Sequence, residues 1–125
     1  MKRTIPFELF NEKQELCFTI PGIVALEKAL GKSIQQIVHS QDAGFNFCLT
    51  ALPICLKNLN PHLYVKKIED YLSIEGRTID DIAMPIIHAV AVSGALGKKV
   101  SDDVMTIYYP ELYKKTAEDE AEKNG

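Results

Sequence analysis

Histidine and cysteine are the residues in this sequence that most readily bind metals or act as nucleophiles. There are three of each: His39, His62, His88, Cys17, Cys48 and Cys55. No two histidines have the helical His-x-x-x-His spacing, and no two cysteines form Cys-x-x-Cys. The sequence also lacks a Gly-x-Gly-x-x-Gly phosphate loop and a Gly-x-Ser-x-Gly nucleophile motif. We therefore predict no catalytic residues, no metal and no cofactor, and expect that the protein is not an enzyme.

Structural explanations are available for the remaining polar residues that stand out. His88 lies within the apolar stretch MPIIHAVAV, where a lone histidine is typical of an interior or interface position. The acidic pairs Asp80–Asp81 and Asp102–Asp103 come near expected helix starts, where carboxylates interact favourably with the helix dipole. The cysteines are expected to be small, buried side chains with free thiols.

The charge of the chain is unevenly distributed. The net charge is −3, and the last ten residues, TAEDEAEKNG, also carry −3, so residues 1–115 are neutral. A neutral domain is a poor electrostatic match for nucleic acid. No apolar run reaches the roughly 18 residues of a membrane span, and no signal peptide is visible. We expect one domain over residues 1–115, a disordered or fraying acidic tail over 116–125, a cytoplasmic location, and binding to neither nucleic acid nor membrane.

The first third of the chain predicts a hairpin followed by two helices. TIPFELF and QELCFTI both alternate between apolar and polar residues, which predicts a β-hairpin over residues 4–20 with a polar turn at 11–13. The apolar period then changes to that of a helix. Gly31 is a natural helix end, and Ser33 can cap a second, short helix.

The middle of the chain predicts two further helices. Residues 42–59 are apolar on nearly every side, which is typical of a helix in the centre of a core or in an interface. Pro53 is expected to kink this helix or to mark its restart. Asn60 and Pro61 form a strong start signal for a helix that extends to Leu72.

The last third contains a long apolar segment and an ambiguous one. Thr78 and Asp81 resemble a capping box before an apolar helix that Gly97 should end. The segment SDDVMTIYYPELYKK could continue as a helix before Pro110, or its VMTIYY part could form a strand. The predicted fold is mainly α (α+β), with an N-terminal β-hairpin followed by a bundle of five to six short helices.

One segment has the shape of a helix-turn-helix. IVALEKALGKSIQQIV predicts an apolar helix, a Leu-Gly turn and a Ser-capped helix that would read DNA. The second helix contains no Arg, however, and Lys32 is the basic residue nearby. Glu27 also stands where a small residue is expected between the two helices. Because the shape of the segment still matches the motif, a small helix-turn-helix DNA-binding regulator of prophage origin is kept as the alternative function.

Three segments, in this order and spacing, resemble the tail assembly chaperones of long-tailed, siphovirus-type phages and prophages. The first is LEKALGK at 26–32, after the hairpin. The second is DYL at 70–72 with GRTID at 76–80. The third is Ser93-Gly94, near the end of the apolar helix. The resemblance extends over roughly residues 5 to 98.

The resemblance implies a non-catalytic protein that acts during tail morphogenesis. Such chaperones bind the long, largely helical tape measure protein, help to recruit tail tube subunits, and leave before the virion is finished. The resemblance thus implies tape measure and tail tube proteins as partners. It supplies no binding residues, because no family motif fixes them.

The excess of apolar surface on two helices suggests where a partner could bind. One face of residues 79–96 is expected to pack on the 45–56 segment, and the remaining apolar surface is expected to be covered by a client or by another copy of a homo-oligomer. The candidate partner-binding residues are Leu49, Leu52, Leu56, Ala89, Val92 and Leu96. The alternative is that both helices are simply central in a helical core.

Overall fold

A short antiparallel hairpin opens the fold, as predicted. The computed structural model describes residues 3–41, 43–56 and 61–114. Strands β1 (Ile5–Pro6) and β2 (Glu15–Leu16) pair with Ile5 opposite Leu16. The strands are shorter than predicted, because the Thr19 side chain accepts a hydrogen bond from the Gly22 amide and caps a helix that already begins at Ile20.

The next two helices follow the predicted capping signals. Helix α1 (Ile20–Leu30) ends at Gly31, whose φ of 68° lies in the left-handed region that glycine adopts without strain. Helix α2 (Ile34–Ser40) begins with a complete capping box: Ser33 accepts from the Gln36 amide, and the Gln36 side chain accepts from the Ser33 amide.

Helices α3 (Phe45–Cys55) and α4 (Pro61–Leu72) come next. Pro53 lies within α3, near its C-terminal end. The predicted cap at Asn60 lies outside the described residues. Helix α3 contacts α1, α4 and α5, which makes it a central element of the fold.

Helix α5 (Asp80–Val92) is shorter than predicted, because it ends at Val92 rather than near Gly97. The Ser93 hydroxyl donates to the Val90 carbonyl and accepts from the Ala95 amide, and Gly94 has a φ of 91°. These features turn the chain before helix α6 (Lys98–Tyr108). The ambiguous segment is thus helical rather than a strand, and residues 110–114 are helical as well.

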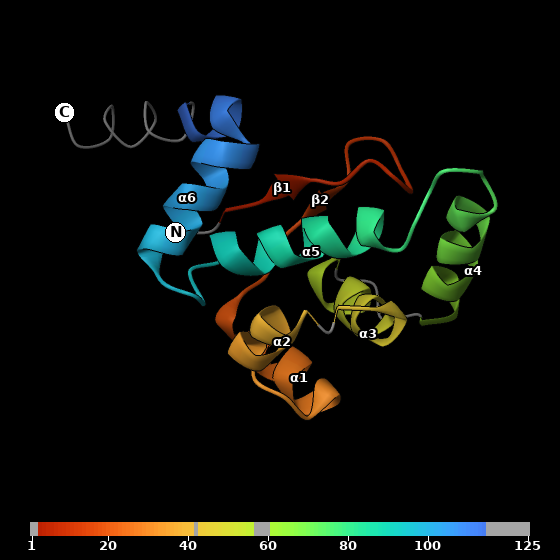
Figure 1. Cartoon of the computed structure of the whole chain (residues 1–125), viewed down its shortest axis with the longest axis horizontal. Coiled ribbons are helices and arrows are strands. Elements are labelled where there is room, and N and C mark those ends of the chain that lie inside the picture. Colours follow the sequence, from red (N-terminus) through yellow and green to blue (C-terminus); the bar gives the residue numbers. More distant parts are fainter. Residues whose placement is uncertain (1–2, 42, 57–60, 115–125) are drawn as a thin grey trace.

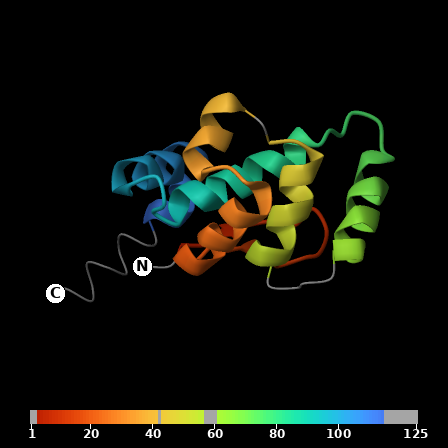
Figure 2. The same cartoon turned by 90° about the horizontal axis from the view of Figure 1, so that it is seen from below.

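Helix α5 crosses the middle of the molecule, between the hairpin and the layer of α1 and α3 (Figure 1). Helices α4 and α6 lie at opposite ends of the long axis in both views (Figures 1 and 2). The predicted fold class, mainly α with an N-terminal hairpin, is confirmed. The predicted acidic tail at 116–125 lies outside the described residues.

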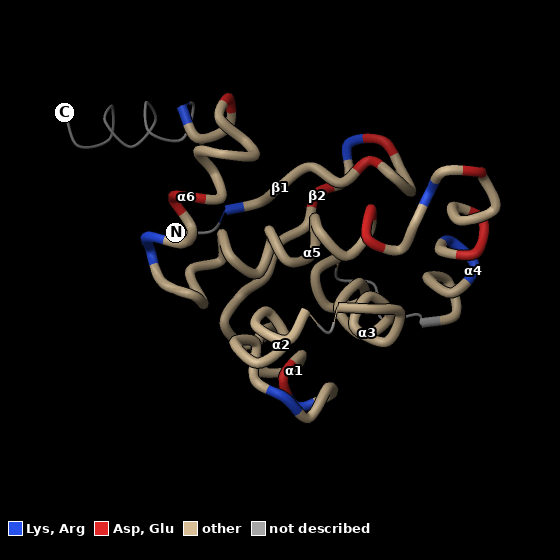
Figure 3. Tube along the Cα trace, in the orientation of Figure 1, with Lys and Arg blue, Asp and Glu red and all other residues tan. Residues whose placement is uncertain are grey.

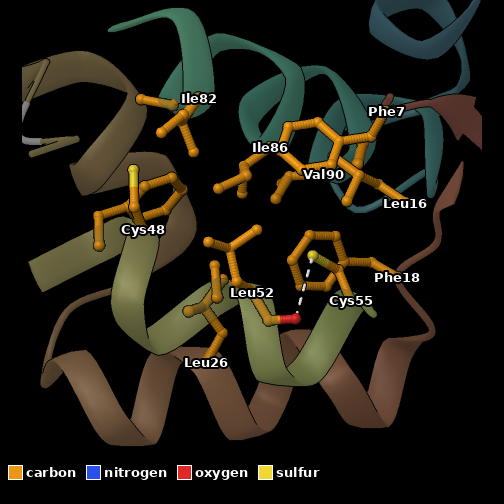
Figure 4. Close-up of a cluster of buried hydrophobic side chains, with 14 of the residues drawn as sticks. Phe7, Leu16, Phe18, Leu26, Cys48, Leu52, Cys55, Ile82, Ile86 and Val90 are labelled. Atoms are coloured by element: carbon orange, nitrogen blue, oxygen red, sulfur yellow. Dashed lines mark hydrogen bonds between the residues drawn. The ribbon is translucent and has the colours of Figure 1, made fainter. Parts of the chain in front are cut away.

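The core forms where α1, α3, α5 and the hairpin meet (Figure 4). Ile82, Ile86 and Val90 of α5 point toward Leu52 of α3, while Leu26 of α1 lies on the far side of Leu52. Phe7, Leu16 and Phe18 close the core from the hairpin side.

Candidate functional site

A groove between α3 and α4 is a strongly apolar concave surface. Its volume is about 500 Å³. Five of its lining side chains are apolar, and two are polar. The lining residues are Phe45, Leu49, Val65, Ile68, Leu72, Glu69 and Ser73. An apolar concave surface of this kind is suited to apolar contact with a bound group.

The spacing of these residues makes the groove run along both helices. Phe45 and Leu49 are one turn apart on α3, while Val65, Ile68 and Leu72 form an i, i+3, i+7 stripe on α4. Phe45 is 53% exposed and Val65 is 48% exposed, so both offer apolar surface to a partner. Two helices with adjoining apolar stripes form the surface on which a third helix packs, ridges into grooves.

Helix α4 forms the outer wall of the groove, and its position depends on few contacts. It packs on α3 (Figure 1). At its C-terminal end, the Tyr71 hydroxyl donates to Asp81 at 3.0 Å, and the Arg77 guanidinium lies 4.5 Å from the centre of the Tyr71 ring. The Thr78 amide donates to the same Asp81 oxygen, at 3.0 Å. We call these four residues the clasp, because they join the end of α4 to the start of α5.

The clasp corrects one detail of the predicted capping box. The Asp81 carboxylate accepts from the Thr78 amide, as in a capping box. Ile79, rather than Thr78, is however the residue that flanks the helix, and no side chain caps the start of α5. Asp81 instead receives its second bond from Tyr71, so the signal that predicted a helix start also fixes α4.

The structure separates the six predicted partner-binding residues. Leu49 lines the groove. Leu56 and Leu96 are half-buried and lie outside the groove lining.

The other three are buried, and the expectation that they contact a partner is wrong for this conformation. Leu52 and Ala89 are 0% exposed, and Val92 is 2% exposed. The reason is helical period: Leu52 and Cys48, one turn apart, face α1 and α5, whereas Phe45 and Leu49 face α4. For these three residues, the alternative of a simple core position is the correct one.

The groove lining includes four apolar residues that were not among the predicted partner-binding residues: Phe45, Val65, Ile68 and Leu72. A signal was available on α4, which carries apolar residues on two faces. Tyr64 and Ile68 are buried, while Val65 lies nearly half exposed beside them. A single stripe would have sufficed to pack α4 on α3.

His88 is an interior residue, as expected. It is 9% exposed, its Nδ1 atom lies 2.9 Å from the Tyr109 hydroxyl, and its ring centre lies 4.3 Å from that of Tyr108. Burial lowers the pKa of His88, so the imidazole is neutral at pH 7. Tyr108 and Tyr109 contact the His88 ring and so join the C-terminal part of the chain to α5.

The cysteines are free thiols in the structure. Cys48 and Cys55 are buried, as expected, and Cys17 is half-buried. Burial raises the pKa of both buried thiols to about 12, with a further contribution from Asp80 at Cys48. Neither buried cysteine is therefore a thiolate nucleophile at neutral pH.

Glu27 has a structural role in the segment that resembles a helix-turn-helix. Its Oε2 atom accepts a hydrogen bond from the Ile34 amide at 2.9 Å, which satisfies a free donor at the start of α2. The exposed residues of α2 include Gln35, Gln36 and His39, and the helix contains no Lys or Arg. Helix α2 thus lacks the cations with which recognition helices usually contact phosphates.

The described residues contain neither a candidate metal site nor a candidate membrane span. No three His, Cys, Asp or Glu side chains gather closely enough to hold a metal ion in residues 3–41, 43–56 and 61–114. Over the same ranges, no helix has both the length and the apolar character needed to cross a membrane. In comparisons with known proteins, no family model, curated protein or solved structure matches this chain.

Proposed function

We propose that this protein is a non-catalytic tail assembly chaperone of a phage or prophage, and that it binds a helix of the tape measure protein in the α3–α4 groove. The groove carries the proposal, because five apolar side chains line it and two of them are about half exposed. The resemblance of residues 26–32, 70–80 and 93–94 to this chaperone family supports the choice of client.

The physical fit is that of helix-in-groove recognition. A long helical client has apolar stripes that aggregate when they are exposed to water. Helix α4 has 12 residues and is therefore about 18 Å long, so the groove can accept about three turns of a client helix. Burying the exposed part of a side chain such as Phe45 contributes about 1 kcal/mol. Several such contacts together give reversible binding, as a chaperone requires.

The remaining parts of the proposal follow from the resemblance. The protein would help to recruit tail tube subunits to the tape measure protein, self-associate as a homo-oligomer, and act in the cytoplasm of the bacterial host. It would be absent from the finished virion.

Co-expression with the tape measure protein encoded beside it tests the proposal. We expect affinity purification of the tagged chain to recover a complex, and we expect the tape measure protein to be insoluble when it is expressed alone. Val65→Asp places a charge in the groove and should weaken the complex at least about tenfold. Because Val65 is half exposed, this variant should still fold, which circular dichroism can check.

Ile107→Asp is the matched control. Ile107 is 67% exposed and lies on α6, at the opposite end of the molecule (Figure 1). This variant should bind the client like the unmodified protein. A tape measure protein that is soluble alone and does not bind would contradict the proposal. Loss of binding in Ile107→Asp, but not in Val65→Asp, would move the client site to α6.

A further inference from the structure

Glu69 is a charged residue in an otherwise nearly apolar groove. It is exposed at the groove surface on α4, one turn after Val65 and four residues before Ser73, which directly follows the helix. The opposite wall, α3, contains no charged residue from Phe45 to Cys55 (Figure 3). No cation therefore lies across the groove on α3 to balance the Glu69 carboxylate.

Lys66 and Ser73, the polar residues about one turn before and after Glu69, both contact Asp70. Lys66 forms an ion pair with Asp70 at 3.9 Å, and the Ser73 hydroxyl donates to the Asp70 carbonyl at 2.6 Å. Among the described residues, none forms an ion pair or a hydrogen bond with the Glu69 side chain. The carboxylate is thus available to a group that enters the groove.

A helix that settles into the groove removes water from one side of Glu69. Partial burial of a carboxylate is unfavourable unless a cation or a hydrogen-bond donor replaces the lost water. We infer that the bound helix carries a Lys or Arg beside its apolar stripe, and that this cation pairs with Glu69. The inference rests on the proposed function, because it specifies which helix the groove selects.

The position of Glu69 also sets where that cation belongs. The groove-lining residues of α4 and of the turn after it extend from Val65 to Ser73, with Glu69 at the midpoint. A cation near the centre of a client stripe would face it, whereas a cation two turns away would lie about 11 Å further along the groove. The pair would act mainly on specificity, since a helix with an acidic residue at this place would be repelled.

Three synthetic peptides can test this pairing with the full chain. Each has about 18 residues, the same leucine stripe at i, i+3, i+4 and i+7, and either Lys, Gln or Glu beside the centre of the stripe. Binding of each labelled peptide is measured by fluorescence anisotropy at low and high ionic strength. We expect the Lys peptide to bind about fivefold more tightly than the Gln peptide at low salt, and the Glu peptide to bind most weakly. The differences should shrink at high salt.

Charge reversal at the groove provides the decisive comparison. E69K should invert the order, so that the Glu peptide binds most tightly. E111K changes the net charge equally at an exposed residue of the helical stretch 110–114, near the opposite end of the molecule, and should preserve the original order. Circular dichroism establishes that both variants fold.

The possible failures are distinguishable. If all three peptides bind equally to the unmodified chain and to E69K, but V65D abolishes binding, the pairing is refuted while helix binding in the groove stands. If no peptide binds, or if V65D has no effect, both the pairing and the proposed groove are refuted.

Discussion

Leu52→Ala tests the central correction that the structure makes to the sequence-based interpretation. Leu52 is 0% exposed and lies between Leu26 of α1 and Ile86 and Val90 of α5 (Figure 4). Truncation to alanine would leave a cavity where three elements meet. Leu→Ala substitutions at such fully buried positions cost about 3–4 kcal/mol, because the surroundings collapse only partly. For a chain of this length, we expect the melting temperature to fall by about 10–15 °C.

The assay is urea unfolding followed by circular dichroism at 222 nm. A domain of this size has a stability of about 5–15 kcal/mol, so the variant should remain folded in the absence of urea. Val65→Ala is the control, because Val65 is 48% exposed and its truncation should cost less than about 1 kcal/mol. A Leu52→Ala variant destabilised by less than about 1 kcal/mol, but unable to bind the client, would refute the core position and restore Leu52 as a contact residue.

Three further predictions concern caps and titration. Ser33→Ala removes the acceptor for the Gln36 amide and should lower the free energy of unfolding by about 1 kcal/mol in the same assay. Glu27→Gln keeps an acceptor for the first amide of α2 but removes its charge, so it should cost about 0.5 kcal/mol, and no loss at all would argue against this cap. Burial lowers the pKa of His88 in the folded state, so the unfolded chain binds protons more readily. The contribution of His88 to stability should thus be complete above about pH 6.5 and decrease as the pH falls toward the folded-state pKa. His88→Gln should show a flatter dependence of the urea midpoint between pH 7.5 and 5, and equal slopes would contradict this reasoning.

Local signals in the sequence predicted most elements of the fold, although the segment that forms α6 was left open between a helix and a strand. Gly31 and Ser33 act through hydrogen bonds and dihedral preferences that span four residues or fewer. The helix end at Gly31 and the helix start at Ser33 can therefore be predicted without knowledge of the tertiary structure. The hairpin was likewise predicted from alternation, but its end was not. Thr19 looks like a strand residue in the alternating pattern, yet its hydroxyl caps α1.

The candidate binding surface, the α3–α4 groove, could not be predicted in the same way. Helix α3 is apolar nearly all round, so its sequence does not distinguish Leu52, which faces the core, from Leu49, which faces the groove. That distinction depends on which neighbours cover α3, and it emerges only from the packing of α1, α4 and α5. The end of α5 at Val92 similarly depends on hydrogen bonds of the Ser93 side chain. The apolar periodicity and the glycine at position 97 do not indicate these bonds, so the predicted helix was too long.

The segments 70–72 and 76–80, which contribute to the family resemblance, contain three of the four clasp residues: Tyr71, Arg77 and Thr78. Of the residues in those segments, Leu72 lines the groove, whereas Tyr71 and Arg77 stack and bond at its end. Helix α4 otherwise packs on α3, so the clasp determines how the outer wall of the groove is held. A client helix gains affinity only if that wall is already in place, because ordering it on binding would cost free energy. Under the proposed function, these segments would serve client binding by holding α4 in position, while Phe45 and Val65 would contact the client helix.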